Sequence, residues 1–92
     1  MSSMLCRNRV VDFERWKAVL DSHVAAHRTY GLRLTHLWRT VGDENNVFFV
    51  FDLESIERAK AFINAPEAAE AGRHSGVIEG EYHFVETVDR NG

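Results

Sequence analysis

The segment that most constrains the fold is residues 47–51 (VFFVF), five consecutive apolar residues near the middle of the 92-residue chain. Successive side chains of a β-strand point to opposite faces of a sheet, so a strand with this sequence presents apolar side chains to both faces. Two helices can cover only one face of a small sheet. We therefore expect the other face to be covered by a partner, most simply a second copy of the chain.

Capping residues and apolar periodicity predict the elements around this strand. Asp12 and Ser55 are expected helix N-caps, Gly31 is expected to end the first helix, and Pro66 to start a short helical turn. The turn-rich residues 42–46 predict an antiparallel hairpin between the second and third strands. The expected elements, in order, are a strand over 4–10, a helix from 12 to 30, a strand over 32–41, a strand over 47–51, a helix over 56–64, a helical turn over 66–71 and a strand over 81–88.

The resulting order is βαββαβ, the ferredoxin-like split motif. Crossover connections in such units are right-handed, which places both helices on one face of an antiparallel sheet. The predicted fold class is therefore α+β. The sequence contains no repeats and no linker long enough to separate domains, so we expect one domain over residues 1–92.

Composition excludes several classes of protein. Apolar residues make up 45% of the chain and charged residues 27%, as in globular and not disordered proteins. A net charge of −3 with interspersed signs argues against nucleic-acid binding. No apolar run approaches the roughly 20 residues that span a bilayer, and the N-terminus lacks a signal-peptide core. Cys6 is the only cysteine, which fits a reducing compartment, and we expect a cytoplasmic location.

Three segments carry a resemblance to a known superfamily: residues 11–17 (VDFERWK), Gly31 at the start of a strand, and residues 59–62 (AKAF). Together they are similar to the dimeric α+β barrel superfamily. That group includes antibiotic-biosynthesis monooxygenases, small polyketide cyclases, haem-degrading monooxygenases and stress-responsive barrel proteins. The resemblance covers almost the whole chain and implies a homodimer in which two sheets pair face to face.

The first predicted helix points to a pocket. At about 100° per residue, its core-facing stripe contains six residues: Phe13, Trp16, Leu20, His23, His27 and Tyr30. The stripe is apolar at its N-terminal half, whereas its C-terminal half carries two imidazoles and a phenol. Polar groups on a face that packs against a sheet predict a cavity between helix and sheet.

Three interpretations of His23 and His27 stay open. An i, i+4 pair could bind a metal if His36 or His83 supplied a third ligand, but the glutamate of the HExxH pattern is missing and we expect no metal. The pair could instead mark an organic-ligand pocket and act in acid–base chemistry. It could also consist of hydrogen-bonded histidines in a core or dimer seam.

The resemblance supplies a comparison with haem-degrading members, which use an asparagine on the first strand, a tryptophan on the third and a histidine on the second helix. Asn8 is similar to the first, but the third strand has Phe49 and Phe51, and residues 56–64 contain no histidine. We therefore do not expect haem degradation, although the histidines of the first helix leave haem binding by another arrangement open. The prediction is that the protein has no cofactor. Cofactor-free monooxygenases use Asn, Trp, Tyr and Arg around an activated phenol, roles that Asn8, Trp38 and Tyr82 could fill.

These observations predict a homodimer that binds a small aromatic or polycyclic molecule and acts on it as a cofactor-independent monooxygenase or cyclase. The expected catalytic residues are His23 and His27. The expected ligand-binding residues are Asn8, Trp16, Tyr30, His36, Trp38 and His83. The alternative is a non-catalytic homodimeric stress-response or interaction module in which the same residues fill the core.

Overall fold

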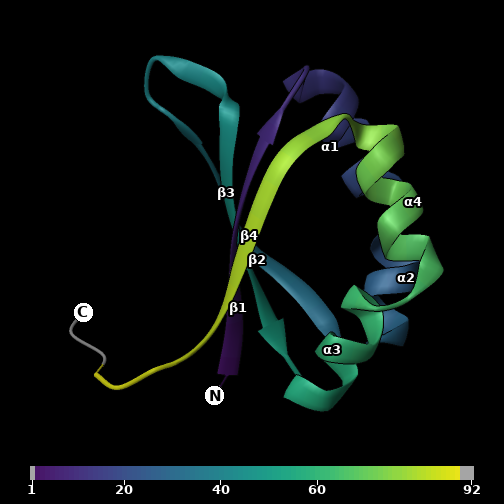
Figure 1. Ribbon diagram of the computed structural model, residues 1–92. Helices are drawn as coiled ribbons and strands as arrows, with labels where there is room; N and C mark the ends of the chain where they lie inside the picture. The colour runs from purple at the N-terminus through teal and green to yellow at the C-terminus, as the bar shows by residue number, and fades with distance from the viewer. Residues whose placement is uncertain (1, 90–92) are drawn as a thin grey trace.

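The computed structural model describes residues 2–89 and contains a four-stranded sheet with a layer of helices on one face (Figure 1). The elements, in chain order, are β1 (Ser2–Val10), α1 (Phe13–Ser22), α2 (Val24–Thr29), β2 (Leu32–Thr40), β3 (Asp43–Leu53), α3 (Ile56–Ile63), α4 (Pro66–Ser75) and β4 (Val77–Glu86). No helix in this part of the chain is long and apolar enough to cross a membrane.

The sheet order is β2-β3-β1-β4, and all three strand pairs are antiparallel. This arrangement confirms the predicted ferredoxin-like α+β fold. The two crossovers place the helices on the same side of the sheet and leave the opposite face uncovered (Figure 1).

The core lies between the sheet and the helices. Every second residue of β3 points into it: Val47, Phe49, Phe51 and Leu53 are all buried. The residues between them, including Phe48 and Val50, point to the uncovered face and are only partly buried. The central strand is thus apolar on both sides, as residues 47–51 predict.

Side-chain caps fix the starts of two helices as expected. The Asp12 carboxylate accepts a hydrogen bond from the Arg15 backbone N–H, and Ser55 Oγ accepts one from the Arg58 backbone N–H, both at 3.0 Å. Gly31, with φ +71°, makes the left-handed turn from α2 into β2.

The first helix is not continuous, which corrects the prediction of one helix from residue 12 to 30. It breaks at His23, whose φ and ψ of −105° and 12° lie outside the helical range. The Ser22 hydroxyl and the His23 ring both approach the Val19 backbone oxygen, at 2.7 and 2.8 Å. These side chains compete for a carbonyl of the last turn and favour the end of α1 at this point.

Three other boundaries differ from prediction. The hairpin turn is shorter than residues 42–46, because β3 begins at Asp43. The turn at Pro66 continues as the ten-residue helix α4 and ends before Gly76, which is left-handed at φ +77°. β4 begins at Val77, four residues before the expected start at Glu81.

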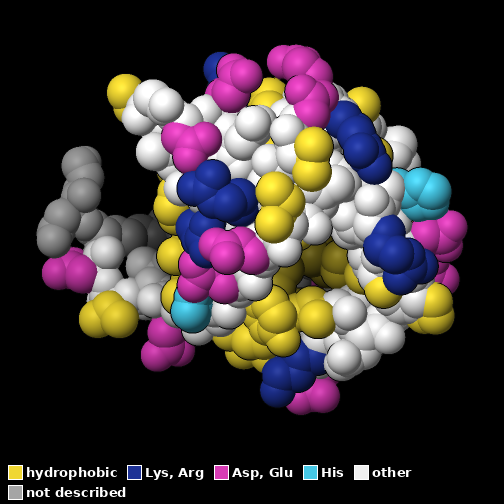
Figure 2. All heavy atoms as spheres, turned by 45° about the horizontal axis from the view of Figure 1, so that its top comes forward, with side chains coloured by type: hydrophobic (Ala, Val, Ile, Leu, Met, Phe, Trp, Pro, Cys, Tyr) yellow, Lys and Arg dark blue, Asp and Glu magenta, His cyan; other side chains and the backbone are white. Residues whose placement is uncertain are grey.

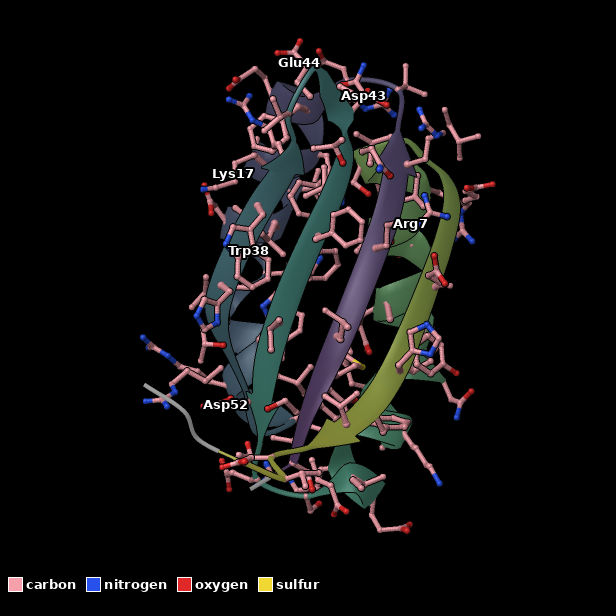
Figure 3. The ribbon with its side chains drawn as sticks, turned by 90° about the vertical axis from the view of Figure 1, so that its left-hand side faces the viewer. Arg7, Lys17, Trp38, Asp43, Glu44 and Asp52 are labelled. Atoms are coloured by element: carbon pink, nitrogen blue, oxygen red, sulfur yellow. The ribbon has the colours of Figure 1, made fainter. Side chains whose placement is uncertain are left out.

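The uncovered face consists of side chains aligned in rows across the four strands (Figure 3). Strand register places two such rows, His36–Val50–Leu5–His83 and Trp38–Phe48–Arg7–Glu81. The Arg7 guanidinium binds the carboxylates of Glu79 and Glu81 at 2.7 and 2.5 Å. Apolar side chains and ion pairs therefore alternate on this face.

Candidate functional site

A cavity of about 260 Å³ lies between the sheet and the helices, and residues of β4 and α4 form part of its lining. Hydrophobic side chains form the floor of the hollow visible in Figure 2. Its walls are lined by Met4, Cys6, Asn8, Trp16, Val19, Leu20, His23, His27, Phe49, Phe51, Phe62, Ile63, Ala68, Ala71, Gly72, Ser75, Val77, Gly80, Glu81 and Tyr82. The lining is mostly apolar and aromatic with a few polar groups, as in small-molecule sites.

His27 and Ser75 are the buried polar residues of this lining within residues 2–89. His27 is only 8% exposed and packs edge-on against Phe51 and Phe62, with ring centroids 4.9 and 5.4 Å away. No hydrogen bond joins its ring nitrogens to another group among residues 2–89, so they border open space. Burial lowers the pKa of His27 below its ordinary value of 6.5, and the nearby His23 lowers it further. At neutral pH the ring is therefore uncharged and keeps one acceptor nitrogen.

His23 lines the same cavity but is tied to the backbone. Its Nδ1 lies 2.8 Å from the Val19 backbone oxygen and 3.0 Å from Ser22 Oγ. A carbonyl only accepts, so Nδ1 carries the proton and donates it, which leaves Nε2 as the acceptor. His23 thus belongs both to the helix break and to the wall of the cavity.

Asn8 and Trp16 are joined at the cavity wall. With the Asn8 amide oriented to satisfy both of its neighbours, Oδ1 accepts from Trp16 Nε1 at 3.2 Å and Nδ2 donates to the Arg7 backbone oxygen at 2.9 Å. Gly80, across the strand pair, makes room for this amide, because a Cβ there would lie 2.8 Å from it. The indole is therefore held in place by a hydrogen bond as well as by packing.

Cys6 adds a thiol to the cavity lining. Burial raises its pKa to about 12, so the group is a protonated thiol at neutral pH. It is a weak hydrogen-bond donor there, and its Sγ lies 3.9 Å from the Met4 backbone oxygen.

The structure brings together four of the eight predicted site residues: Asn8, Trp16, His23 and His27 all line the cavity. Tyr30 does not line it; it packs against Phe62, with ring centroids 5.4 Å apart. The interpretation of Tyr30 as a hydrogen-bonding group in the cavity is corrected accordingly.

The three predicted strand residues lie elsewhere. His36, Trp38 and His83 point to the uncovered face, with the sheet between them and the cavity. The His36 and Trp38 rings stack on each other at 4.9 Å, and His83 Nε2 lies 3.3 Å from a Glu81 oxygen. The prediction that His36, Trp38 and His83 bind a ligand in the cavity is therefore corrected, because strand alternation assigns them to the opposite side of the sheet.

Tyr82, which the sequence offered as a possible partner of an activated phenol, reaches the cavity side of β4. The wall formed by α4, which consists of small residues, was not predicted. The sequence does indicate that these small residues share one face of α4. Their spacing is i, i+3, i+4, i+7, at Ala68, Ala71, Gly72 and Ser75. Apart from the Ser75 hydroxyl, this face has no functional group, so its pattern does not indicate a catalytic site.

A second, larger groove also borders His27. It measures about 660 Å³, and its lining includes the charged side chains of Asp21, Arg28, Arg33, Asp52 and Glu54. His27 and Leu20 line both spaces. Within residues 2–89, no three or more His, Cys, Asp or Glu side chains are grouped so as to hold a metal ion.

Comparison with known proteins supports the fold. No family model matches the sequence, and no curated protein matches it. Solved structures do match. A candidate antibiotic biosynthesis monooxygenase from Bordetella bronchiseptica superposes with a TM-score of 0.79 at 14% identity, covering 95% of this chain and 96% of its own. SnoaB, a cofactor-independent oxygenase from Streptomyces nogalater, also gives 0.79, at 13% identity, with 97% and 94% covered.

The same architecture occurs in an uncharacterised NIPSNAP domain protein from Burkholderia xenovorans, with a TM-score of 0.68, 14% identity, and 96% and 95% of the two chains covered. At such identities these likenesses establish a common fold. They confirm the ferredoxin-like α+β fold that the sequence predicts. A shared fold does not imply a shared function, which depends on the residues of the site.

Proposed function

We propose that this protein binds a small, neutral, hydroxylated aromatic molecule in the helix–sheet cavity, with His27 accepting a hydrogen bond from the hydroxyl. The observation that carries the proposal is the mostly buried, uncharged imidazole that borders the cavity. Its ring nitrogens are not among buried atoms lacking a partner, so they remain accessible, and an accessible ring nitrogen can accept a hydrogen bond from a ligand hydroxyl.

The charge of the lining favours a neutral ligand. No lysine or arginine lines the cavity, so a carboxylate or phosphate would find no cationic side chain there. Glu81 is the one acidic residue of the lining, and its carboxylate is bound to Arg7 at 2.5 Å. The aromatic rings of Trp16, Phe49 and Phe51 offer flat surfaces for an aromatic ligand.

We infer further that the bound molecule is oxygenated without a resident cofactor. On this proposal His27 acts as general base and takes the hydroxyl proton of a phenol. The phenolate then reduces dioxygen. For a phenol with a free para position, phenol plus O₂ gives a quinone plus water: one oxygen atom becomes the new carbonyl and the other leaves as water. The structural likeness to SnoaB, an oxygenase described as cofactor-independent, supports this chemistry.

Calorimetric titration with 1-naphthol tests the binding step. We expect His27→Leu to weaken binding about tenfold or more, because it removes the acceptor for the hydroxyl. His74→Leu makes the same change at an exposed histidine of α4 and should bind like the unmodified protein. Unchanged affinity in His27→Leu would contradict the role given to His27.

Incubation with 1-naphthol under oxygen-18 gas tests the reaction. We expect 1,4-naphthoquinone that carries one labelled oxygen, formed with the unmodified protein and lost with His27→Leu. Tight binding without quinone formation would leave a binding protein and remove the oxygenase part of the proposal.

A second function, self-association, is supported by a different observation. The uncovered sheet face exposes apolar side chains, among them Trp38 with half of its surface open. We propose that a second copy of the chain covers this face. If no aromatic probe binds, this homodimeric role remains as the non-catalytic alternative.

A further inference from the structure

The groove of about 660 Å³ that borders His27 is a second place where a ligand could be held. It lies between α2 and β2, an outer strand of the sheet, and reaches the end of β3. Val24 and Leu34 line it and keep 45% and 38% of their surface exposed, although both are large hydrophobic residues. Apolar side chains left open in a concave surface are typical of a ligand-binding site. The other apolar side chains of its lining are Leu20, Leu32 and Leu53.

Three carboxylates also line the groove, and each is already bound to a basic side chain. The ion pairs are Asp21–Lys17 at 2.7 Å, Asp52–Arg33 at 3.1 Å and Glu54–Arg58 at 2.9 Å. Asp52, labelled in Figure 3, lies near the end of β3. Because each acid of the lining has its own cation, these three pairs together add no net charge to the groove.

Arg28 is the charged residue of the groove lining that stands outside these pairs. The residue is exposed, and no ion pair within residues 2–89 includes it. A guanidinium keeps its charge at neutral pH and can donate two parallel hydrogen bonds to a carboxylate. The groove therefore combines an open apolar surface with one positive charge that no acid of the described chain balances. The helix–sheet cavity differs, because neither lysine nor arginine lines it.

We propose that the groove is a second binding site, for a small organic anion that has an apolar body and one carboxylate. The apolar body packs against Val24 and Leu34, and the carboxylate oxygens accept hydrogen bonds from the Arg28 guanidinium. This ligand class is the opposite of the neutral hydroxylated molecule proposed for the cavity. The inference goes beyond the proposed function and does not depend on it.

Calorimetric titration with 1-naphthoate tests the site, and naphthalene-1-carboxamide serves as a neutral compound of similar shape. Arg28→Met removes the guanidinium and retains an unbranched apolar side chain. Arg73→Met makes the same change at an exposed arginine of α4 that borders neither space and forms no ion pair within residues 2–89. Circular dichroism checks that each variant is folded.

We expect the unmodified protein to bind 1-naphthoate more tightly than the carboxamide, with an affinity that falls as salt is added. Arg28→Met should weaken 1-naphthoate binding about tenfold or more, because it removes a charge-assisted hydrogen bond, and should change carboxamide binding little. Arg73→Met should leave both affinities unchanged. Failure of the unmodified protein to bind 1-naphthoate, or equal affinities in Arg28→Met and Arg73→Met, would overturn the inference.

A second pair of variants distinguishes the groove from the cavity. Val24→Asp and Ala68→Asp each add one negative charge; of the two spaces, Val24 borders only the groove and Ala68 only the cavity. Val24→Asp should weaken 1-naphthoate binding at least as much as Arg28→Met does, and Ala68→Asp should not. The reverse result would place the anion in the cavity and overturn the inference. None of these outcomes bears on the function proposed for the cavity, which is tested separately with 1-naphthol.

Discussion

His27 is a titratable side chain in surroundings that disfavour its charged form. The rings of Phe51 and Phe62 pack against it, and the charge interaction with His23 lowers its pKa in the same direction as burial does. Such an imidazole stays neutral at a pH where an exposed histidine is already partly protonated. A neutral ring is the form that accepts a hydrogen bond, so the surroundings preserve the state that the proposed function needs.

The lowered pKa of His27 predicts a loss of stability in acid. In the unfolded chain this residue takes up a proton near its ordinary pKa of 6.5, whereas the folded protein does so only at lower pH. Between those two values the unfolded state binds more protons, so the free energy of unfolding falls as the pH drops through 6.5 towards the pKa of the folded protein. Thermal melts at pH 7.5 and 5.5 should show a lower midpoint in acid.

His27→Leu should reduce the difference between those two midpoints, and His74→Leu, at an exposed site, should retain it. An equal pH dependence in His27→Leu and the unmodified protein would show that this residue is not the group responsible.

Cys6 offers a second test at the residue scale. Its thiol is 5% exposed, and its pKa of about 12 leaves almost no thiolate at neutral pH. Since the thiolate is the reactive form, we expect labelling by Ellman's reagent to be slow in the native protein and rapid in denaturant. Fast labelling under native conditions would mean that the cavity wall opens far more often than a packed core does.

The junction between α2 and β2 depends on Gly31. Its φ is +71°, and a Cβ there would lie 2.9 Å from the Glu54 Cβ. We expect Gly31→Ala to lower the free energy of unfolding by about 2 kcal/mol or more, from backbone strain and crowding together. Urea denaturation measures this loss.

Gly42 provides the matched control for Gly31. It also has a positive φ, +88°, but a Cβ there would meet nothing within 4 Å. Gly42→Ala should therefore cost only the conformational part, about 1 kcal/mol. Equal losses in the two variants would show that the contact with Glu54 does not contribute.

The elements and their order were largely predictable, because caps and apolar periodicity are local signals. Asp12, Ser55 and Gly31 act where the sequence places them. The break at His23 was not predictable from periodicity, since the apolar stripe continues across it and the cause is a competition for the Val19 carbonyl.

The candidate site was predictable only in part, and for a different reason. Alternation correctly separates His36 and Trp38 from Leu37, but it does not say which set faces the helices. That choice depends on register with β3, where Leu37 pairs with the buried Phe49. The same ambiguity applies to β4, where Tyr82 faces the cavity and its neighbour His83 faces the uncovered side. Helix residues carry no such ambiguity, and Trp16, His23 and His27 were placed on the correct side.

At the scale of the whole molecule, the uncovered face predicts self-association. Apolar residues from all four strands lie on it, and an exposed patch of that kind is unusual for a monomer. We expect a two-fold dimer that buries at least about 1,000 Å². Light scattering at micromolar concentration should give twice the chain mass of 10.5 kDa.

Val50→Asp places a charge in the middle of the uncovered face and should shift the mass towards the monomer while circular dichroism stays native. Ala61→Asp, at an exposed position of α3, is the control and should remain dimeric. A single 10.5 kDa species for the unmodified protein would exclude this dimer.

β1 serves both sides of the molecule with alternate residues. Met4, Cys6 and Asn8 face the cavity, whereas Leu5 and Arg7 face outwards beneath the proposed partner. Point substitutions in β1 can therefore alter ligand preference or assembly one at a time, which leaves the two properties free to diverge separately among descendants of this chain. Insertion or loss of one residue in β1 would exchange the two sets at once. We expect length changes in this strand to be excluded in evolution, even where many substitutions are tolerated.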